Sequence, residues 1–194
     1  MLRFCFLSLL LTGFFVAAHS QTKIQWGEDV EVTLDSFKDT PPNLEENAAQ
    51  EFSLYTTYEF AYQMTAAQFA FTKNFNRYVE AYYVPEFSWM EEGELTAELL
   101  AMCNLNFDVS ELFARKFRKE LYERKRFGSS ADFFTEANSY ISHEYSKFTA
   151  ELNSRLSVAP DWNVVINEYS QKVNDEIQAL NEYCKSCKIS KKKK

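Results

Sequence analysis

The sequence predicts an α+β fold in which a small antiparallel sheet is followed by three helices. Residues 48–63 alternate between two faces, which is typical of a half-buried strand. Residues 76–84 are rich in β-branched and aromatic residues and are stopped by Pro85, which indicates another strand. After Gly93 the apolar residues recur every three or four positions, as on helices with one buried stripe. Strands followed by a run of helices indicate an α+β domain.

The first twenty residues have the pattern of a secretory signal peptide. Arg3 precedes an apolar run from Phe4 to Ala17, and Ala18-His19-Ser20 is a small-x-small cleavage signal. The alternative is an uncleaved membrane anchor, but the run is shorter than the roughly 20 residues of a spanning helix. We therefore expect a secreted protein that is released after cleavage.

Removal of residues 1–20 takes away one basic residue and leaves 28 acidic residues against 20 basic ones. We expect a single domain over 21–188 and a basic tail over 189–194, with no further membrane-spanning segment. The acidic balance does not favour nucleic-acid binding. Lys191–Lys194 is expected to be a solvated tail, and a role at an anionic surface is the alternative.

Shorter patterns predict the remaining elements before the helices. Lys23–Trp26 suits a short strand, and Thr33 can cap one helical turn. Phe69 and Phe71 fit a further short strand, and residues 86–93 are expected to form a loop. Because the connections are too short for helical crossovers, the strands should pair in an antiparallel sheet.

The first predicted helix runs from about Glu94 to Arg126 and ends at Gly128, a residue suited to a helix C-terminus. Its apolar stripe is Leu95, Leu99, Met102, Val109, Phe113, Phe117 and Leu121. Asn106 is a polar residue on that stripe, four positions after Met102.

Two more helices are predicted after Gly128. Ser129-x-x-Asp132 resembles a capping box, Pro160 stops this second helix, and Asp161 can cap the third. The stripe of the second helix is Phe134, Ala137, Ile141, Phe148, Leu152 and Leu156. The stripe of the third is Trp162, Val165, Ile166, Tyr169, Val173, Ile177, Leu180 and Cys184.

Candidate catalytic and metal-binding side chains are few. His143 begins a His-Glu-x-x pattern whose second histidine is replaced by Lys147, so we expect a solvent-facing histidine and not a zinc ligand. A nucleophilic pair of Cys103 with His143 is the alternative. Glu111 and Arg115 are four residues apart and should form a surface ion pair of roughly 0.2–0.5 kcal/mol.

The cysteines permit disulfide chemistry in an oxidising compartment. Cys184 and Cys187 form either a local disulfide or two core positions at the end of the last helix. A thiolate there would oppose the helix dipole, which does not favour a redox motif. Cys103 is expected to be a small buried apolar residue.

The stretch from Leu99 to Leu121 reads LLAMCNLNFDVSELFARKFRKEL. It resembles a run of the form LLxHEQxHFDIxELxARxLRKEL in domain-of-unknown-function family 922, a group of secreted bacterial proteins predicted to be zinc-dependent proteases. Ile24-Gln25-Trp26, Pro41-Pro42, Ala48-Ala49 and Trp162 extend the resemblance along the chain. Family-matching helix positions include Phe107, Asp108, Glu111 and Arg115. The resemblance implies a zincin-like fold and a bacterial protein that is secreted across the inner membrane, to the periplasm or the medium.

The chain departs from the family where the chemistry would lie. Met102 and Asn106 stand where the family has its two metal histidines, and Cys103 stands where it has the glutamate expected to act as general base. A later family histidine corresponds more loosely to Ser154. Methionine and asparagine do not replace two imidazoles on Zn²⁺. We therefore expect no zinc cofactor and no family activity.

These observations lead to three hypotheses about function. The first is a secreted zincin-like domain that has lost its zinc site and acts as a non-catalytic binding or structural protein, with a peptide or protein partner. The second is a secreted metallo- or cysteine-dependent peptidase with a relocated site around Cys103, His143 and nearby carboxylates. The third is a helical, chaperone-like envelope protein with few strands. The sequence leaves the oligomeric state open.

Overall fold

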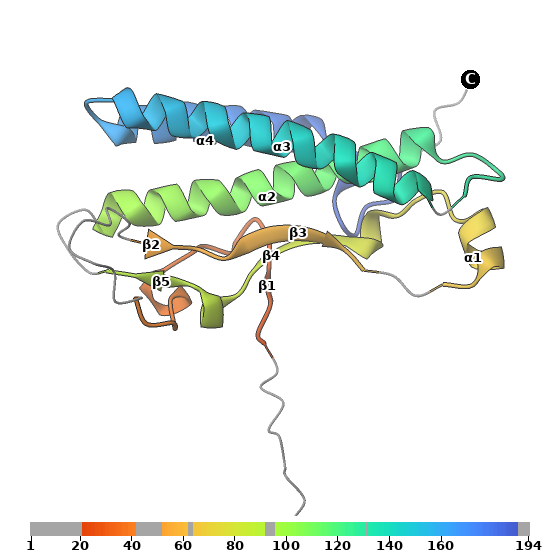
Figure 1. The fold of residues 1–194 in the computed structure, drawn as a ribbon, viewed down its shortest axis with the longest axis horizontal. Helices are drawn as coiled ribbons and strands as arrows, with labels where there is room; N and C mark the ends of the chain where they lie inside the picture. The colour runs from red at the N-terminus through yellow and green to blue at the C-terminus, as the bar shows by residue number, and fades with distance from the viewer. Residues whose placement is uncertain (1–20, 42–51, 62–63, 92–95, 131, 190–194) are drawn as a thin grey trace, which may run out of the picture.

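The fold has three layers (Figure 1). The structure, a computed structural model, describes residues 21–41, 52–61, 64–91, 96–130 and 132–189. Antiparallel strands form the first layer, the long helix α2 (Thr96–Arg124) forms the second, and α3 (Asp132–Val158) and α4 (Trp162–Ala179) form the third. The predicted α+β class, with a small sheet followed by three long helices, is confirmed.

The strands make two small antiparallel sheets. The larger has the order β1 (Ile24–Gln25), β4 (Val79–Tyr83) and β3 (Thr56–Phe60). The smaller pairs β2 (Phe52–Ser53) with β5 (Trp89–Met90). The alternating run of residues 48–63 therefore contributes a strand to each sheet. Strand β2 ends at Ser53 and pairs with β5, whereas β3 begins at Thr56 and pairs with β4. The prediction of a loop over 86–93 was wrong in part, because β5 lies there and follows a 3-10 turn over Pro85–Phe87.

The predicted strand at Phe69 and Phe71 was also wrong, because these residues lie in a short helix, α1 (Ala66–Phe71). Thr65 Oγ1 accepts a hydrogen bond from the Gln68 N–H, and Gln68 Oε1 accepts one from the Thr65 N–H. This reciprocal capping box satisfies two backbone donors at the helix start, and it outweighs the strand preference of the aromatic residues.

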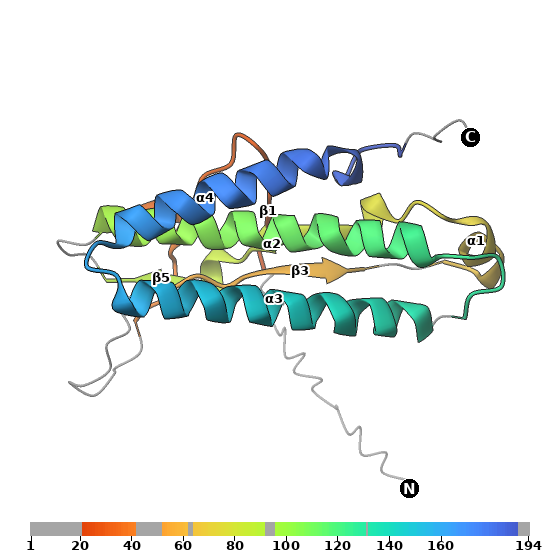
Figure 2. The same ribbon diagram turned by 90° about the horizontal axis from the view of Figure 1, so that it is seen from above.

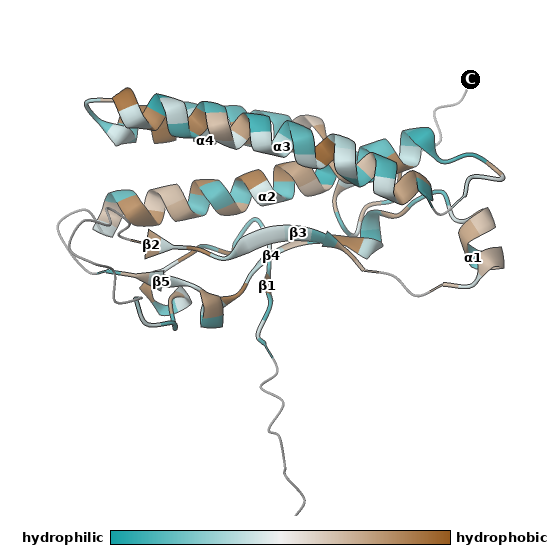
Figure 3. Cartoon of the chain, viewed as in Figure 1, coloured by the Kyte–Doolittle hydropathy of each residue, from teal (hydrophilic) through white to brown (hydrophobic). Residues whose placement is uncertain are grey.

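Helix α2 is buried around most of its circumference in its middle part. The sheet lies against one side of it, and α3 and α4 lie against the other (Figures 1 and 3). The prediction of a single buried stripe was therefore too narrow. Further residues of α2 that are almost fully buried are Leu105, Phe107, Ser110, Leu112 and Ala114.

Helices α3 and α4 lie side by side above α2 (Figure 2). All six predicted stripe residues of α3 are buried. Five of the eight predicted for the last helix are buried, whereas Trp162, Leu180 and Cys184 are only half-buried, and the last two lie beyond the end of α4. The cap at Asp161 is confirmed, because its carboxylate accepts from the Asn163 N–H. Ser129 was predicted to begin a capping box for α3, but its hydroxyl oxygen accepts a hydrogen bond from the Arg126 N–H. This bond lies in the turn after α2, where Gly128 has a φ of 83°.

Several sequence predictions concern residues outside the described ranges. They are the signal peptide over 1–20, the matches at Pro42 and Ala48-Ala49, the stripe position Leu95 and the tail residues 190–194. Within the described ranges, no helix has both the length and the apolar character needed to cross a bilayer.

Candidate functional site

Two of the positions where the family resemblance places chemistry, Met102 and Cys103, belong to the core. Met102 is 6% exposed and joins the main apolar core, which also contains the buried faces of α3 and α4. Cys103 is fully buried in a second cluster with Val32, Tyr83 and Phe107, on the sheet side of α2. Both side chains therefore fill the interior.

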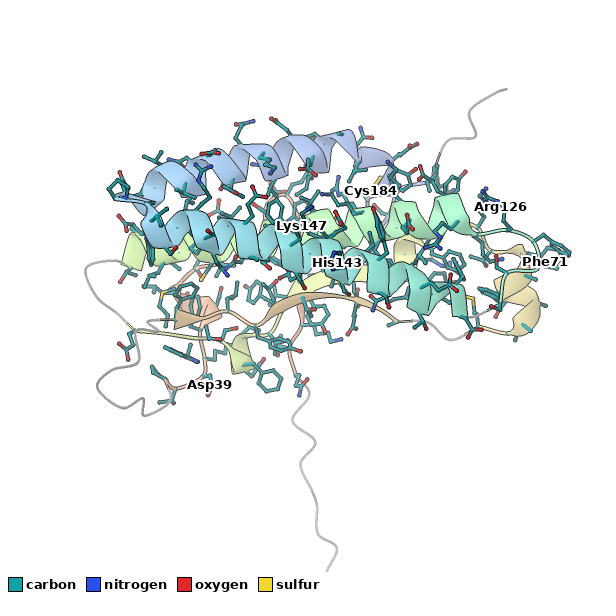
Figure 4. The ribbon with its side chains drawn as sticks, turned by 45° about the horizontal axis from the view of Figure 1, so that its top comes forward. Asp39, Phe71, Arg126, His143, Lys147 and Cys184 are labelled. Carbon is teal, nitrogen blue, oxygen red and sulfur yellow. A yellow bond between two sulfur atoms is a disulfide. The ribbon has the colours of Figure 1, made fainter. Side chains whose placement is uncertain are left out.

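The structure does not bring Cys103 and His143 together. Burial raises the pKa of the Cys103 thiol to about 12, so this group stays protonated near neutral pH. His143 is exposed on α3, in the outermost layer, as we expected from its place off the stripe (Figure 4). The arrangement provides neither a thiolate nor a base beside it.

The four positions aligned with the family's site do not line one pocket. Asn106 is half-buried on α2, and Ser154 is exposed on α3, while Cys103 faces the sheet. A protonated thiol, a packed thioether and two neutral side chains do not fit the tetrahedral N, S and carboxylate ligands of zinc. In the described part of the chain, no group of three or more His, Cys, Asp and Glu side chains is placed to hold a metal ion.

The predicted ion pair of Glu111 and Arg115 is present, but it is buried, so the prediction was wrong about its place on the surface. Their side chains are each 4% exposed, and Arg115 Nε donates to Glu111 Oε1 over 2.8 Å. Arg118, 1% exposed, donates from Nη1 to Glu111 Oε1 over 2.9 Å and from Nη2 to Oε2 over 3.3 Å. The three residues form a buried cluster of one carboxylate and two guanidinium groups.

This buried cluster joins α2 to three other elements. Arg118 donates to the Val79 carbonyl of β4 from Nε over 3.1 Å and from Nη2 over 2.8 Å. Its Nη1 also donates to the Tyr183 carbonyl over 3.1 Å, in the 3-10 turn after α4. Arg115 Nη1 donates to the Ile177 carbonyl of α4 over 2.9 Å. The cluster therefore ties the sheet and α4 to the central helix.

The C-terminal loop closes over the same region. Cys184 and Cys187 are joined by a disulfide in the structure, and Lys185 pairs with Glu80 of β4 (Cys184 is labelled in Figure 4). The Cys187 carbonyl accepts from Asn74 Nδ2 over 3.3 Å and from Asn76 Nδ2 over 3.1 Å. The loop is thus fastened to the segment that leads into β4.

Trp26 stands between two adjoining hollows beside this cluster. Its Nε1 donates to Asp108 Oδ1 over 2.8 Å, and the Arg115 guanidinium lies over its ring at 5.4 Å from the centroid. One hollow, of about 470 Å³, is lined by Gln25, Trp26, Glu28, Arg77, Glu80, Ala81, Glu111, Arg115, Arg118, Cys184, Lys185 and Ser186. The other, of about 540 Å³, is lined by Trp26, Gly27, Glu28, Val30, Glu31, Asn104, Asp108, Asn174, Ile177 and Gln178. We call the two hollows together the Trp26 cleft.

The carboxyl group of Asp108 holds its proton more tightly than an ordinary aspartate. Burial raises its pKa, the negative charge of Glu111 raises it further, and the hydrogen bond from Trp26 opposes both effects. This group belongs to the wall of the cleft, so the charge of the wall depends on pH.

Two residues of this site were not singled out from the sequence. Arg118 lies within the stretch from Leu99 to Leu121 that resembles the family, but no role was predicted for it. Its spacing of seven residues from Glu111 and three from Arg115 puts all three on one helix face, which is a signal that was present. Trp26 was noted only in a short strand and in the family resemblance, and its contact with Asp108 could not be predicted because the two residues are far apart in the sequence.

Replacing Glu111 by Gln should leave two buried guanidinium groups without their anion. We expect Glu111→Gln to lower the free energy of unfolding by roughly 3–5 kcal/mol, as for other broken buried ion pairs. Urea denaturation followed by circular dichroism measures this loss. The matched control is Glu120→Gln on the same helix, which breaks a partly exposed pair with Arg124 and should cost less than about 1 kcal/mol. Equal losses for both variants would contradict the importance of the buried cluster.

Asp108→Asn should stabilise the protein at neutral pH. A raised pKa means that the folded state binds this proton better than the unfolded chain, so the contribution of Asp108 to stability falls as the pH rises through the folded pKa. Asparagine keeps an acceptor for Trp26 without the ionisation. The melting temperature of the variant should exceed that of the wild type at pH 7, and the gain should disappear below the ordinary aspartate pKa of about 3.9. A variant less stable than the wild type at pH 7 would contradict this assignment.

Comparisons of the chain with family models, with curated proteins and with solved structures find no match. The resemblance to family 922 therefore stays a prediction, which depends mainly on the residues from Leu99 to Leu121.

Proposed function

We propose that this chain is a secreted, non-catalytic binding protein that holds a short basic peptide in the Trp26 cleft. The observation that carries the proposal is the half-buried Trp26 indole, which Asp108 fixes between two adjoining hollows. Aromatic side chains held in place in this way are frequent anchors of binding energy, because they offer a large contact area and lose little freedom on binding.

The character of the hollow beside Asp108 supports a basic ligand. Its lining carries the carboxyl groups of Glu28, Glu31 and Asp108 and no basic side chain. A lysine or arginine side chain of a peptide would find negative charge there, which attracts a cation. The indole ring next to it already has the Arg115 guanidinium over it, so it offers apolar contact area.

The edge of the larger sheet supports an extended peptide. Strand β1 pairs with β4 on one side only, and among the described residues no strand pairs with its other edge. An extended chain can add to such an edge through main-chain hydrogen bonds while its side chains enter neighbouring pockets. Gln25 of β1 and the adjacent Trp26 line the cleft, so a peptide on this edge would reach it.

The burial of Met102 and Cys103 supports the loss of the family's chemistry. An imidazole pair and a glutamate at these helix positions would need access to water and to a substrate, whereas these side chains are packed in the core. The peptidase alternative has less support, because Cys103 is inaccessible and His143 is remote from it. The chaperone alternative expected few strands, and the described residues contain five short strands, so the strand content does not argue against it.

Selection of a phage-displayed peptide library on the chain without residues 1–20 tests the binding proposal. The selected peptides should be enriched in lysine and arginine. Their dissociation constants, measured by isothermal titration calorimetry, should rise at least about tenfold for Trp26→Ala, the cost of losing one anchor residue. Val164→Ser, a change at an exposed site on α4, is the control and should leave them unchanged. Peptides that bind Trp26→Ala as tightly as the wild type would overturn the proposal.

Metal analysis and a protease assay test the absence of catalysis. The purified protein should contain no stoichiometric zinc by mass spectrometry and should cleave no member of a broad peptide-substrate panel, with or without a reducing agent. The physical reason is the burial of Cys103 and the scatter of the other candidate ligands. Stoichiometric zinc that is lost in Cys103→Ala or His143→Ala, or proteolysis that is lost in Cys103→Ala, would contradict the proposal.

A further inference from the structure

The end of the molecule formed by α1 and the turn between α2 and α3 exposes two neighbouring aromatic side chains. Phe71 is 81% exposed and Phe127 is 85% exposed, and their ring centroids are 6.5 Å apart. We call the surface made by Phe71, Phe127, Lys73 and Arg126 the aromatic tip (Figure 4 labels Phe71 and Arg126). Single exposed apolar residues are ordinary on soluble proteins, but a pair this exposed and this close indicates an interaction site.

The aromatic tip is held by the core. Phe69, two positions before Phe71, packs on Phe133 and Phe134 of α3 with ring centroids 5.9 Å and 5.4 Å away. Lys125 Nζ lies over the Phe69 ring at 4.4 Å and donates to the Arg126 carbonyl over 2.9 Å. Because Phe69 faces inward, Phe71 on the other side of the same short helix is turned outward. Its exposure follows from the packing of α1.

The segment that carries Phe71 and Lys73 has positive charge and no negative charge. From Phe60 to Thr72 there is no charged residue, and the segment between Glu59 and Glu80 contains Lys73 and Arg77 as its only charged residues. This contrasts with the whole chain, whose net charge is −7. Figure 3 shows the same local character, since α1 is mostly brown whereas much of the outer surface of α3 is teal.

The facing turn has the same bias. Between Glu123 and Asp132 the charged residues are Arg124, Lys125 and Arg126. In the described part of the chain, Lys73 and Arg126 have no carboxylate partner. Lys73 Nζ lies over the Tyr122 ring, and Arg126 Nη1 donates to the backbone carbonyls of Glu123 and Lys125. Two cations are therefore free to pair with an anionic surface.

We propose that the aromatic tip binds the surface of an anionic lipid bilayer, with Phe71 and Phe127 entering the interface and Lys73 and Arg126 contacting headgroup phosphates. Aromatic rings and basic side chains are the combination that such an interface favours. The tip lies on a projecting end of the molecule, where it can reach a bilayer (Figures 1 and 2). The contact area of two rings is far smaller than the roughly 800 Å² per partner that a stable protein interface buries, which favours a bilayer over a protein partner. This inference is independent of the Trp26 cleft.

Vesicle co-sedimentation tests the proposal. The chain without residues 1–20, which keeps every described residue, is mixed with vesicles of phosphatidylglycerol and phosphatidylcholine or of phosphatidylcholine alone. It should bind the anionic vesicles more strongly, and added salt should weaken this binding. Phe71→Ser/Phe127→Ser should lower the partition coefficient by at least about tenfold, since each partly buried ring is expected to contribute a factor of about three or more. Lys73→Gln/Arg126→Gln should lower it several-fold on the anionic vesicles only.

The matched control is Val158→Ser/Val164→Ser, which removes two exposed apolar side chains from the opposite end of the helical layer, where they are 79% and 63% exposed. This control should bind vesicles like the wild type. All variants should have the melting temperature of the wild type, because the changed side chains are exposed. Three results would each overturn the proposal. The first is that the wild type binds no vesicles. The second is that Phe71→Ser/Phe127→Ser binds vesicles like the wild type and that binding is lost only when residues 190–194 are deleted. The third is that light scattering shows an oligomer of the wild type, which binds no lipid, and that Phe71→Ser/Phe127→Ser disrupts this oligomer.

Discussion

The structure depends on one buried electrostatic cluster, in which Glu111 sits between Arg115 and Arg118. Charged groups leave water at a large cost, which is offset only when their donors and acceptors find partners inside. Arg118 meets this condition by reaching β4 and the turn after α4, and Arg115 reaches α4 itself. These elements can therefore not shift far along α2 without leaving a buried guanidinium group unpaired. The cluster fixes their relative positions in a way that apolar packing alone does not.

This constraint also shapes the Trp26 cleft. Arg115 lies over the indole, Asp108 holds its nitrogen, and the disulfide-closed loop at Cys184 lies on the same side of the molecule. A cleft whose walls are joined to the buried cluster is preorganised, so little ordering would be required when a ligand enters. The aromatic tip is built differently, from a capped short helix and a glycine-containing turn held by aromatic packing. Binding at the cleft and binding at the tip can thus be separated by mutation.

Much of the fold could be predicted because local sequence patterns determine it. The stripe of α3 from Phe134 to Leu156 was predicted residue by residue, and the cap at Asp161 is where the sequence placed it. The errors have identifiable causes. Phe69 and Phe71 have strand-forming side chains, but the capping box of Thr65 and Gln68 decides for a helix. Strand β5 is only two residues long and exists because β2 is beside it, which no pattern near Trp89 could reveal.

The sequence by itself determined the class of the fold, the faces of the outer helices and the fact that Glu111 and Arg115 meet. These are consequences of backbone periodicity, which acts over a few residues. Only the tertiary structure decided that this ion pair is buried, that Arg118 completes it, that Trp26 reaches Asp108 and that Phe71 and Phe127 stand together in solvent. Whether a side chain is in water or in the core depends on what distant segments pack against it. The sheet on one side of α2 and two helices on the other turned an expected surface pair into the centre of the molecule.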